Sequence, residues 1–322
     1  MAVILMATAG SCKKDKDNEN ENDDTTTTTT TTANDGVFNP SKKIYKYYYW
    51  DNYDELKRLG EVWHWDENRL SSIDDMNSNG SVARSFYYSY GNDRLVRIDY
   101  SNSYTSFQYS NGRLIKVSMY YYDELESEFS FSYGSNGKVD VISGKYYDSK
   151  KTSRGIFSPM DIILPEQFAG SIDRSRERRE AKRGSKEDGI ETITIKLTWT
   201  GDNVTKYVME DEYSEGEFSE VLTAQMTASY DNRPNPKWGF MGRRFIGESI
   251  EVYYSKNNVT KYTYTEHEIE YENGVLDGDH SSTHEGSLTY QYDDDDYPVV
   301  VTETEVSSSG NTNTSKYYYE YL

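Results

Sequence analysis

The stretch Tyr109-Ser110-Asn111-Gly112-Arg113-Leu114 decides the fold, because it has the residue order of a β-hairpin tip. An aromatic residue ends one strand, Asn-Gly supplies the positive φ angles of a tight turn, and an aliphatic residue opens the return strand. A basic residue often stands just before that aliphatic residue. The same order recurs at Trp65–Leu70, Tyr90–Leu95, Tyr133–Val139, Trp199–Val204 and Tyr254–Val259.

Polarity alternates between these turns, as a sheet with one buried face requires. In the segment 192–199, one face carries Ile193, Ile195, Leu197 and Trp199, and the opposite face carries Thr192, Thr194, Lys196 and Thr198. In the later segment, Leu222, Met226 and Tyr230 likewise share one face. Aromatic residues occupy both faces in 45–50 and 317–321, which predicts cover on both sides there. The repeat predicts an all-β fold, an antiparallel hairpin meander of about a dozen or more strands rolled into a barrel-like sheet.

Composition limits the class of protein and of partner. The 322 residues carry 55 Asp and Glu against 35 Lys and Arg, a formal charge of -20, which disfavours nucleic acid and anionic lipid headgroups as partners. Only 35% of the residues are hydrophobic, yet 32 are Tyr, so Tyr must supply much of the core. Aromatic residues fit a pleated, half-buried surface, which favours sheet over a helix bundle.

The N-terminus has the pattern of a targeting signal. Residues 1–9 are apolar, and Ala9-Gly10-Ser11-Cys12 resembles the bacterial lipobox, which implies a diacylated Cys12 and a membrane anchor. The alternative is a buried Cys near a frayed terminus. The segment is short and lacks a basic n-region, which leaves open a start codon upstream of Met1. Cys12 is the single cysteine, so the chain has no internal disulfide.

Residues 12–40 are predicted to be a disordered acidic and Thr-rich tether, because they have little apolar area to bury. The charged residues behind Cys12 resemble the export signal of Bacteroidetes surface lipoproteins. Asp24-Thr25-Thr26 resembles the O-glycosylation motif of the same bacteria, which makes Thr25 a candidate for modification. A solvated spacer without sugar is the alternative.

The lipobox with its acidic tether and the segment Tyr230–Pro236 together resemble uncharacterised Bacteroidetes lipoproteins with a porin-like β fold. The hairpins are also similar, more loosely, to the Tyr-Asp repeats of Rhs-type shell proteins. The first resemblance implies an outer-membrane lipoprotein on the periplasmic side or at the cell surface. It carries over no functional residues.

Two segments interrupt the hairpins within the single β domain predicted for residues 41–322. The first is an irregular insertion at about 150–190. A short helix is predicted to begin there at Ser158-Pro159-Met160-Asp161 and to end at Pro165. The insertion also contains a strongly charged, predominantly basic stretch, Arg174–Lys186, which is expected to be a solvated loop. The second interruption, Asn232–Phe240, is predicted to be a loop or a bulged edge.

The strands lack the apolar outward face of a membrane-spanning barrel, since their second face is Thr, Ser, Lys or Glu. We therefore interpret the porin-like resemblance as architectural. It predicts a curved sheet that is held near a membrane by Cys12 without crossing it.

Exposed aromatic residues are the best candidates for a binding surface, because a flat ring can stack on a sugar while neighbouring polar groups bond its hydroxyls. Trp50, Trp63, Trp65 and Trp238 are candidates for such a surface. The alternative for each is a place in the core.

Asp279, His280 and His284 form the most ligand-rich stretch and are a candidate metal site. Gly278, Gly286 and the Ser and Thr residues around them predict a loop, so a polar hairpin tip is the alternative. Asp293–Asp296 could attract Ca²⁺, but the run stands at a turn position of the repeat, which favours a solvated acidic turn.

The sequence has no nucleophile elbow, phosphate-binding loop or dinucleotide fingerprint, so it predicts no enzyme and no cofactor. The hypothesis that fits best is a non-catalytic envelope or surface lipoprotein that binds a glycan, a peptide or a partner protein. The alternatives are an envelope-assembly scaffold and a hydrolase that uses carboxylates without a recognisable motif.

Overall fold

The computed structural model describes residues 38–51, 55–147, 190–240 and 254–322. The chain divides into two units, residues 1–30 and 31–322, and every described residue belongs to the second. Within the described residues the regular structure is entirely β-strand. The predicted signal, Cys12, Thr25, the helix beginning at Ser158 and the basic stretch Arg174–Lys186 lie outside them.

Sixteen strands follow one another along the chain. They are β1 (Ile44–Asp51), β2 (Leu56–Asp66), β3 (Arg69–Met76), β4 (Val82–Gly91), β5 (Arg94–Tyr100), β6 (Ser103–Ser110), β7 (Arg113–Tyr121), β8 (Glu124–Tyr133), β9 (Val139–Tyr146), β10 (Ile190–Thr200), β11 (Asn203–Glu215), β12 (Phe218–Pro234), β13 (Asn257–Glu272), β14 (Val275–Tyr292), β15 (Pro298–Ser307) and β16 (Thr312–Tyr321).

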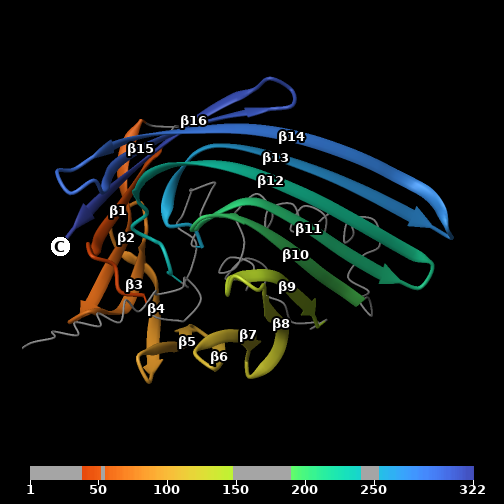
Figure 1. The fold of residues 1–322 in the computed structure, drawn as a ribbon, viewed down its shortest axis with the longest axis horizontal. Helices are drawn as coiled ribbons and strands as arrows, with labels where there is room; N and C mark the ends of the chain where they lie inside the picture. Colours follow the sequence, from red (N-terminus) through yellow and green to blue (C-terminus); the bar gives the residue numbers. More distant parts are fainter. Residues whose placement is uncertain (1–37, 52–54, 148–189, 241–253) are drawn as a thin grey trace, which may run out of the picture. The chain divides into compact units, whose positions relative to one another are not determined.

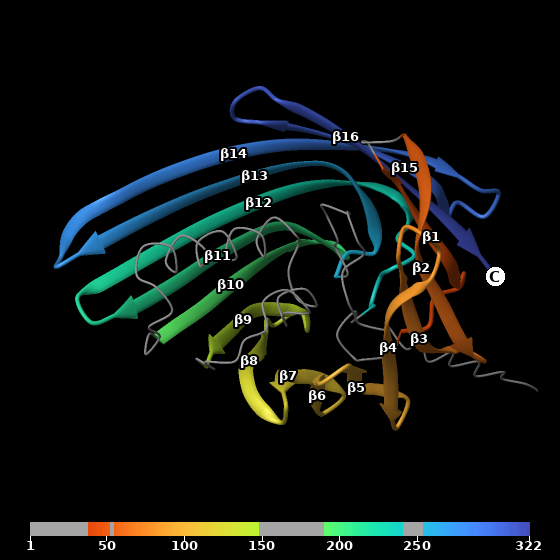
Figure 2. The same ribbon diagram turned by 180° about the vertical axis from the view of Figure 1, so that it is seen from behind.

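The strands form one closed antiparallel barrel, which confirms the all-β prediction. Each strand pairs with the next in sequence, and β1 pairs with β16 to close the circle. Figures 1 and 2 show β10 to β14 running side by side as long neighbouring strands. A meander of this kind needs only short local connections at most of its turns, which the hairpin repeats supply.

The predicted alternation is confirmed on the inward face. Ile193, Ile195 and Leu197 on β10 are buried, and so are Leu222 and Met226 on β12. The outward positions between them are half-buried or exposed, and most of them are hydroxyl, amide or charged residues, among them Thr192, Thr194, Lys196, Thr198, Glu210, Glu212, Thr223, Gln225 and Thr227. These described strands are therefore apolar inside and polar outside.

The seam between β1 and β16 differs from the prediction of cover on both sides. Tyr47, Tyr317 and Tyr319 are buried in the core, whereas Tyr48 and Tyr318 point outward and are only half-buried. The Lys57 ammonium lies 4.0 Å from the Tyr48 ring centroid and 4.7 Å from that of Tyr318. A lysine side chain thus covers the outward rings, because its apolar stem can lie on them while its charge stays in water.

The aromatic residue of each hairpin repeat hydrogen-bonds to the neighbouring hairpin. The Tyr109 hydroxyl donates to the Leu95 carbonyl at 2.8 Å, and the Tyr133 hydroxyl donates to the Leu114 carbonyl at 2.7 Å. In each case the acceptor is the aliphatic residue that opens the return strand of the preceding repeat. One residue position therefore ends a strand and also fixes it to the strand pair beside it.

These bonds run around the whole of one barrel end, and we call the eight of them the clasp. They are Trp65 to Ile44, Tyr90 to Leu70, Tyr109 to Leu95, Tyr133 to Leu114, Trp199 to Val139, Tyr230 to Val204, Tyr290 to Val259 and Tyr321 to Pro298. Each acceptor is the carbonyl of a residue that is buried. The eighth repeat lies at the β1–β16 seam. Its aromatic residue, Tyr321, comes from the last strand, and its aliphatic residue, Ile44, comes from the first, so the circle of bonds closes there.

The basic residue of the repeat also acts between hairpins. The Arg113 guanidinium carbon lies 5.1 Å from the centroid of the Tyr133 ring, and the Lys138 ammonium lies 5.0 Å from that of Trp199. Arg94 lies in the same way over Tyr109, at 6.0 Å. The recurring basic residue is thus explained by a cation–π contact with the aromatic residue of the next repeat.

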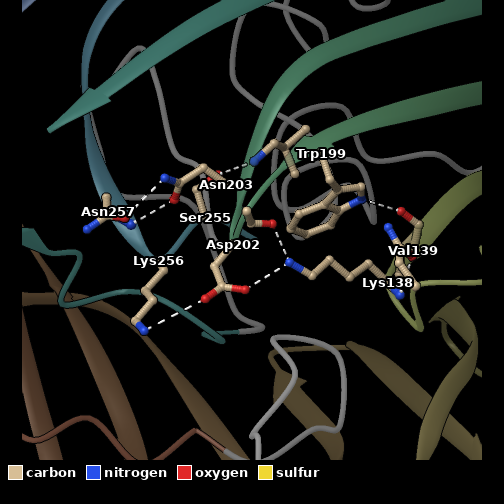
Figure 3. A network of polar contacts seen from close by, with 11 residues as sticks. Lys138, Val139, Trp199, Asp202, Asn203, Ser255, Lys256 and Asn257 are labelled. Carbon is tan, nitrogen blue, oxygen red and sulfur yellow. Dashed lines mark hydrogen bonds and ion pairs between the residues drawn. The ribbon is translucent and has the colours of Figure 1, made fainter. Parts of the chain in front are cut away.

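The fifth repeat joins its neighbours through further polar contacts (Figure 3). Besides lying over Trp199, Lys138 forms an ion pair with Asp202 at 2.8 Å. Asn203 and Asn257 exchange two hydrogen bonds of 3.0 Å, one from each residue. The hydrogen bond from Lys138 holds the pKa of Asp202 below its usual value, although burial acts in the opposite direction.

The prediction of a repeat at Tyr254–Val259 was wrong in its first half. The aromatic residue of that hairpin is Tyr230 on β12, and Val259 on β13 accepts the bond from Tyr290 of the following hairpin. Tyr254 lies outside any strand and is buried. The predicted loop at 232–240 begins later than expected, because β12 continues to Pro234, with one register shift between Ser229 and Tyr230 and another between Tyr230 and Pro234.

Removing one hydroxyl of the clasp should destabilise the barrel. We expect Tyr109→Phe to lower the free energy of unfolding by about 1–2 kcal/mol, because the Leu95 carbonyl loses its donor. Urea denaturation measures the change. Tyr87→Phe, at an outward ring that is 57% exposed, is the control and should change stability by less than about 0.5 kcal/mol. Equal effects of the two substitutions would contradict the role of the clasp.

Alkaline pH should open the clasp end. Burial raises the pKa of Tyr90 to about 12, against a weaker opposing effect of Arg69, and burial raises the pKa of Tyr230 as well. A pKa raised in the folded state makes a stability contribution that is complete below the unfolded value of about 10 and is lost as pH rises through the folded value. Stability should therefore fall between about pH 10 and 12. Far-ultraviolet circular dichroism recorded alongside phenolate absorbance should show both changes together, and free ionisation of all tyrosines at pH 10 without unfolding would contradict this.

Candidate functional site

Of the four predicted tryptophans, Trp63 belongs to the core and Trp65 packs against it. Trp63 is 1% exposed, donates from Nε1 to a Glu61 carboxylate oxygen at 3.0 Å and packs 4.8 Å from the Phe240 ring centroid. Trp65 is half-buried, packs against the core and is a member of the clasp.

The other two tryptophans are half-buried and lie on different elements. Trp50 is on β1 beneath the Lys316 ammonium, at 5.5 Å, and Trp238 is in the turn after β12 beneath Lys256, at 5.8 Å. Each ring thus has a lysine over it. The structure does not bring the four tryptophans together into one platform.

The barrel interior is packed with aromatic rings near the clasp. Phe240 lies 5.1 Å from Phe38 and 6.3 Å from Tyr88, centroid to centroid. The pocket between these rings has a volume of about 10 Å³. A single water molecule needs roughly that space, so this packing leaves no room for a larger ligand.

The predicted His loop is a strand. His280 and His284 lie within β14, on the inward side, about 13 Å apart for four residues of strand. His284 Nδ1 lies 2.9 Å from a Glu305 oxygen. Asp279 is on the opposite face, with an oxygen 2.9 Å from His267 Nε2. The three predicted metal ligands therefore do not converge.

The glycines that suggested a loop there have another cause. At Gly286 an added side chain would run into the Tyr262 ring, and at Gly278 it would meet a Glu270 carboxylate oxygen. These glycines let large neighbouring side chains approach the β14 backbone. Their role depends on contacts across the sheet, which the sequence does not show.

The acidic run at 293–296 is a turn, which the sequence favoured over a Ca²⁺ site. Asp293 accepts hydrogen bonds from the backbone N–H groups of Asp295 and Tyr297, at 3.0 Å each, and pairs with Lys42 at 2.5 Å. Burial alone would raise the pKa of Asp293, but the bonds from Lys42 and the two N–H groups outweigh it and lower that pKa.

A group of buried carboxylates inside the barrel is the feature that sequence analysis missed. Glu191 on β10, Asp211 on β11, Glu220 on β12, and Glu268 and Glu270 on β13 all point inward, and their exposed fractions lie between 1% and 7%. We call these five residues the acidic face. They lie toward the barrel end opposite the clasp, since each stands several residues along its strand from a clasp residue.

Strand register brings the acidic face together. Glu220 pairs with Glu270, and one step along the sheet Leu222 pairs with Glu268. One carboxylate oxygen from each of Glu220, Glu268 and Glu270 lies within 4.8 Å of the other two. The period-2 pattern contained this signal, because Glu220 stands two residues before Leu222 on the predicted buried face. Acidic residues are abundant in this chain, so the pattern alone did not distinguish it.

A further inward carboxylate shows how such a group is accommodated. Glu303 on β15 is 2% exposed and accepts hydrogen bonds from the hydroxyls of Tyr262 and Tyr317, at 3.0 and 3.1 Å. Phenolic hydroxyls are strong donors to a buried carboxylate. Each of these tyrosines thus contributes to the core in two ways. Its ring buries apolar surface, and its hydroxyl donates a hydrogen bond to the buried carboxylate.

Comparison with known proteins adds solved structures but no family. No family model matches the chain, and no curated protein matches it. One similar solved structure is a porin-like protein from Bacteroides uniformis, with 10% identity, coverage of 89% of this chain and 99% of that chain, and a TM-score of 0.45. Another is a porin-like protein from Bacteroides vulgatus, with 10% identity, coverage of 87% and 99%, and a TM-score of 0.34.

Replacing Glu303 tests its place in the core. Glu303→Leu should lower the free energy of unfolding by about 2–4 kcal/mol, because two buried tyrosine hydroxyls lose their acceptor. Glu303→Gln keeps one acceptor oxygen and should cost less. Thermal unfolding followed by circular dichroism measures both, and a Leu variant as stable as the wild-type protein would contradict this role.

Proposed function

We propose that the chain is a non-catalytic, non-conducting structural protein of the cell envelope. In this proposal the barrel is a rigid scaffold outside the lipid, and an acylated Cys12 holds it near the membrane. The observation that carries the proposal is the polar outward face of the described strands, which is clearest on β10 to β12.

The outward face supports a barrel surrounded by water. A membrane-spanning barrel needs an outward apolar band about 25 Å tall, and an outward Lys or Arg at mid-depth costs about 2–4 kcal/mol, with Asp and Glu costing less. On β10 to β12, outward Lys196, Glu210 and Glu212 lie among Thr and Gln. No helix among the described residues is long and apolar enough to cross a membrane.

The packing near the clasp supports a barrel without a conducting path. A sixteen-stranded porin leaves an aqueous channel through its centre. Here Phe38, Tyr88 and Phe240 pack together inside one end of the barrel, and the pocket between these rings is about 10 Å³. Aromatic side chains that fill this part of the interior favour a scaffold over a pore.

Location rests on the sequence. The lipobox-like Ala9–Cys12 and the charged tether behind it favour an outer-membrane lipoprotein, on the periplasmic side or at the cell surface. Its partners would then be the membrane, through the lipid on Cys12, and a component of the envelope. The half-buried rings of Trp50 and Trp238 favour a glycan or a protein as that component.

The hydrolase alternative has little support from geometry. His64, His267 and His284 each form a cross-strand pair with a carboxylate on the barrel wall, at 2.8, 2.9 and 2.9 Å. Two of these pairs are on the outward face. Such pairs stabilise a sheet, and in each of them an imidazole nitrogen lies against a carboxylate oxygen.

Membrane attachment tests the proposal directly. Cys12→Ser should move the protein from the membrane fraction to the soluble fraction, because the barrel has no other anchor in this account. Fractionation with an antibody against the barrel measures the shift, and Ser11→Ala is the matched control that should stay membrane-bound. Retention of the Cys12 variant after carbonate washing would overturn the scaffold outside the lipid.

Channel activity tests the second half of the proposal. Purified protein added to planar lipid bilayers should give no conductance steps above background, with a bacterial porin as the positive control. Reproducible steps would contradict a filled barrel. A deletion strain with weakened envelope integrity would support the structural role.

A further inference from the structure

β14 extends past the strand that covers its second side. Its ladder with β13 continues to the Glu272–Val275 pair at the hairpin tip, whereas its ladder with β15 ends at the His284–Ser307 pair. Residues 278–283 therefore pair with β13 on one side and with no described strand on the other. Figure 1 shows β13 and β14 continuing together beyond the end of β15. We call residues 278–283 the open edge.

The open edge carries main-chain groups that can bond another strand. On an edge strand, every second residue directs its N–H and C=O away from the sheet. In the part of the chain that the structure describes, the open edge has no backbone hydrogen bond outside its ladder with β13. Asp279, His280, Ser281 and Thr283 are exposed. A second strand therefore has access to this side of β14.

The sheet behind the open edge holds it in an extended conformation. Along this stretch, β13 lies between β14 and β12, and β12 lies between β13 and β11. A strand that is already extended and supported loses little conformational freedom when another strand binds beside it. The open edge is thus preorganised for strand addition, in which main-chain hydrogen bonds supply the affinity.

The open edge lacks several features that protect other sheet edges. Proline, lysine and very short strands commonly prevent further pairing. Residues 278–283 contain no proline and no lysine, and they belong to a strand that runs from Val275 to Tyr292. The register shift between Glu270 and Tyr271 distorts only the tip-side end of the edge. Pairing is therefore possible along the rest of it.

Charge selects the kind of strand that fits the open edge. Residues 266–283 contain no Lys or Arg, and their acidic members are Glu266, Glu268, Glu270, Glu272, Asp277 and Asp279. A second copy of the chain carries the same acidic hairpin and a formal charge of -20, so like charges oppose edge-to-edge pairing of two copies. A strand rich in Lys or Arg is attracted instead.

We infer that the open edge binds an extended basic segment of another protein by strand addition. The added strand continues the line of β15 beyond Ser307, and its basic side chains face the acidic hairpin. Val275 and Leu276, which are 67% and 55% exposed, offer an apolar contact at the hairpin tip. This inference goes beyond the scaffold proposal and does not depend on it, because a strand edge binds a peptide whether or not Cys12 is acylated.

Peptide binding to the full chain tests both parts of the inference. The probe is a fluorescein-labelled decapeptide of alternating Lys and Thr, and fluorescence anisotropy measures its affinity. The controls are an alternating Glu and Thr peptide and a Lys and Thr peptide that is N-methylated at every residue. The probe should bind at least about tenfold more tightly than either control, because one lacks the charge and the other lacks main-chain donors. Equal binding of the probe and its N-methylated form, or no binding of the probe, would overturn the inference.

Two matched variants locate the binding site on β14. Ser281→Lys adds a positive charge on the outward side of the open edge, and Thr289→Lys adds the same charge on the same face where β14 pairs with β15. The first should weaken binding of the probe by about tenfold or more, and the second by less than about twofold. Equal losses of affinity in the two variants would contradict binding at the open edge.

Hydrogen exchange measured by mass spectrometry provides a second location test on the unmodified chain. The probe should slow amide exchange within residues 278–283, because an added strand accepts hydrogen bonds from their N–H groups. Slower exchange confined to other strands would overturn the inference. Protection of 278–283 that rises with protein concentration in the absence of peptide would assign the open edge to a second copy of the chain, and would overturn it as well.

Discussion

The clasp is the interaction on which the rest of the barrel depends. Antiparallel hairpins form locally, but nothing in a hairpin alone fixes how neighbouring hairpins stagger or where a sheet closes. Each clasp bond ties the end of one strand to a carbonyl of the preceding hairpin, and the last bonds join Tyr321 to Pro298 and Trp65 to Ile44. The cation–π contacts of Arg94, Arg113 and Lys138 strengthen the same junctions. A repeated side-chain contact thus ties each hairpin to the next around the barrel.

A core built from tyrosine explains several features together. The ring supplies apolar area in a chain with few aliphatic residues, and the hydroxyl must find a partner when it is buried. Clasp tyrosines donate to backbone carbonyls, whereas Tyr262 and Tyr317 donate to Glu303. The interior therefore tolerates carboxylates that an aliphatic core would exclude. Glycine at position 286 completes the packing by making room for the Tyr262 ring.

The barrel has two chemically different ends. Aromatic rings around Phe240 fill the clasp end, while the acidic face lies toward the other, where the chain leaves β9 and enters β10. On β10 to β12 the outward face is polar. This arrangement is the reverse of a conducting barrel in a membrane, where the outside is apolar and the lumen is wet. It is the reason that we propose a scaffold and not a pore.

The sequence by itself determined the all-β class, the hairpin repeats and the inward face of strands such as β10 and β12, because turn chemistry and period-2 alternation are local properties. Tertiary structure alone decided which repeat residues pair across hairpins, since Tyr230 and Val259 are separated by a long insertion in the chain. It also decided that His280 and His284 are strand residues and that Glu191, Asp211, Glu220, Glu268 and Glu270 share one buried face. Those facts depend on register between strands, which the contacts of the closed barrel fix and no local pattern encodes.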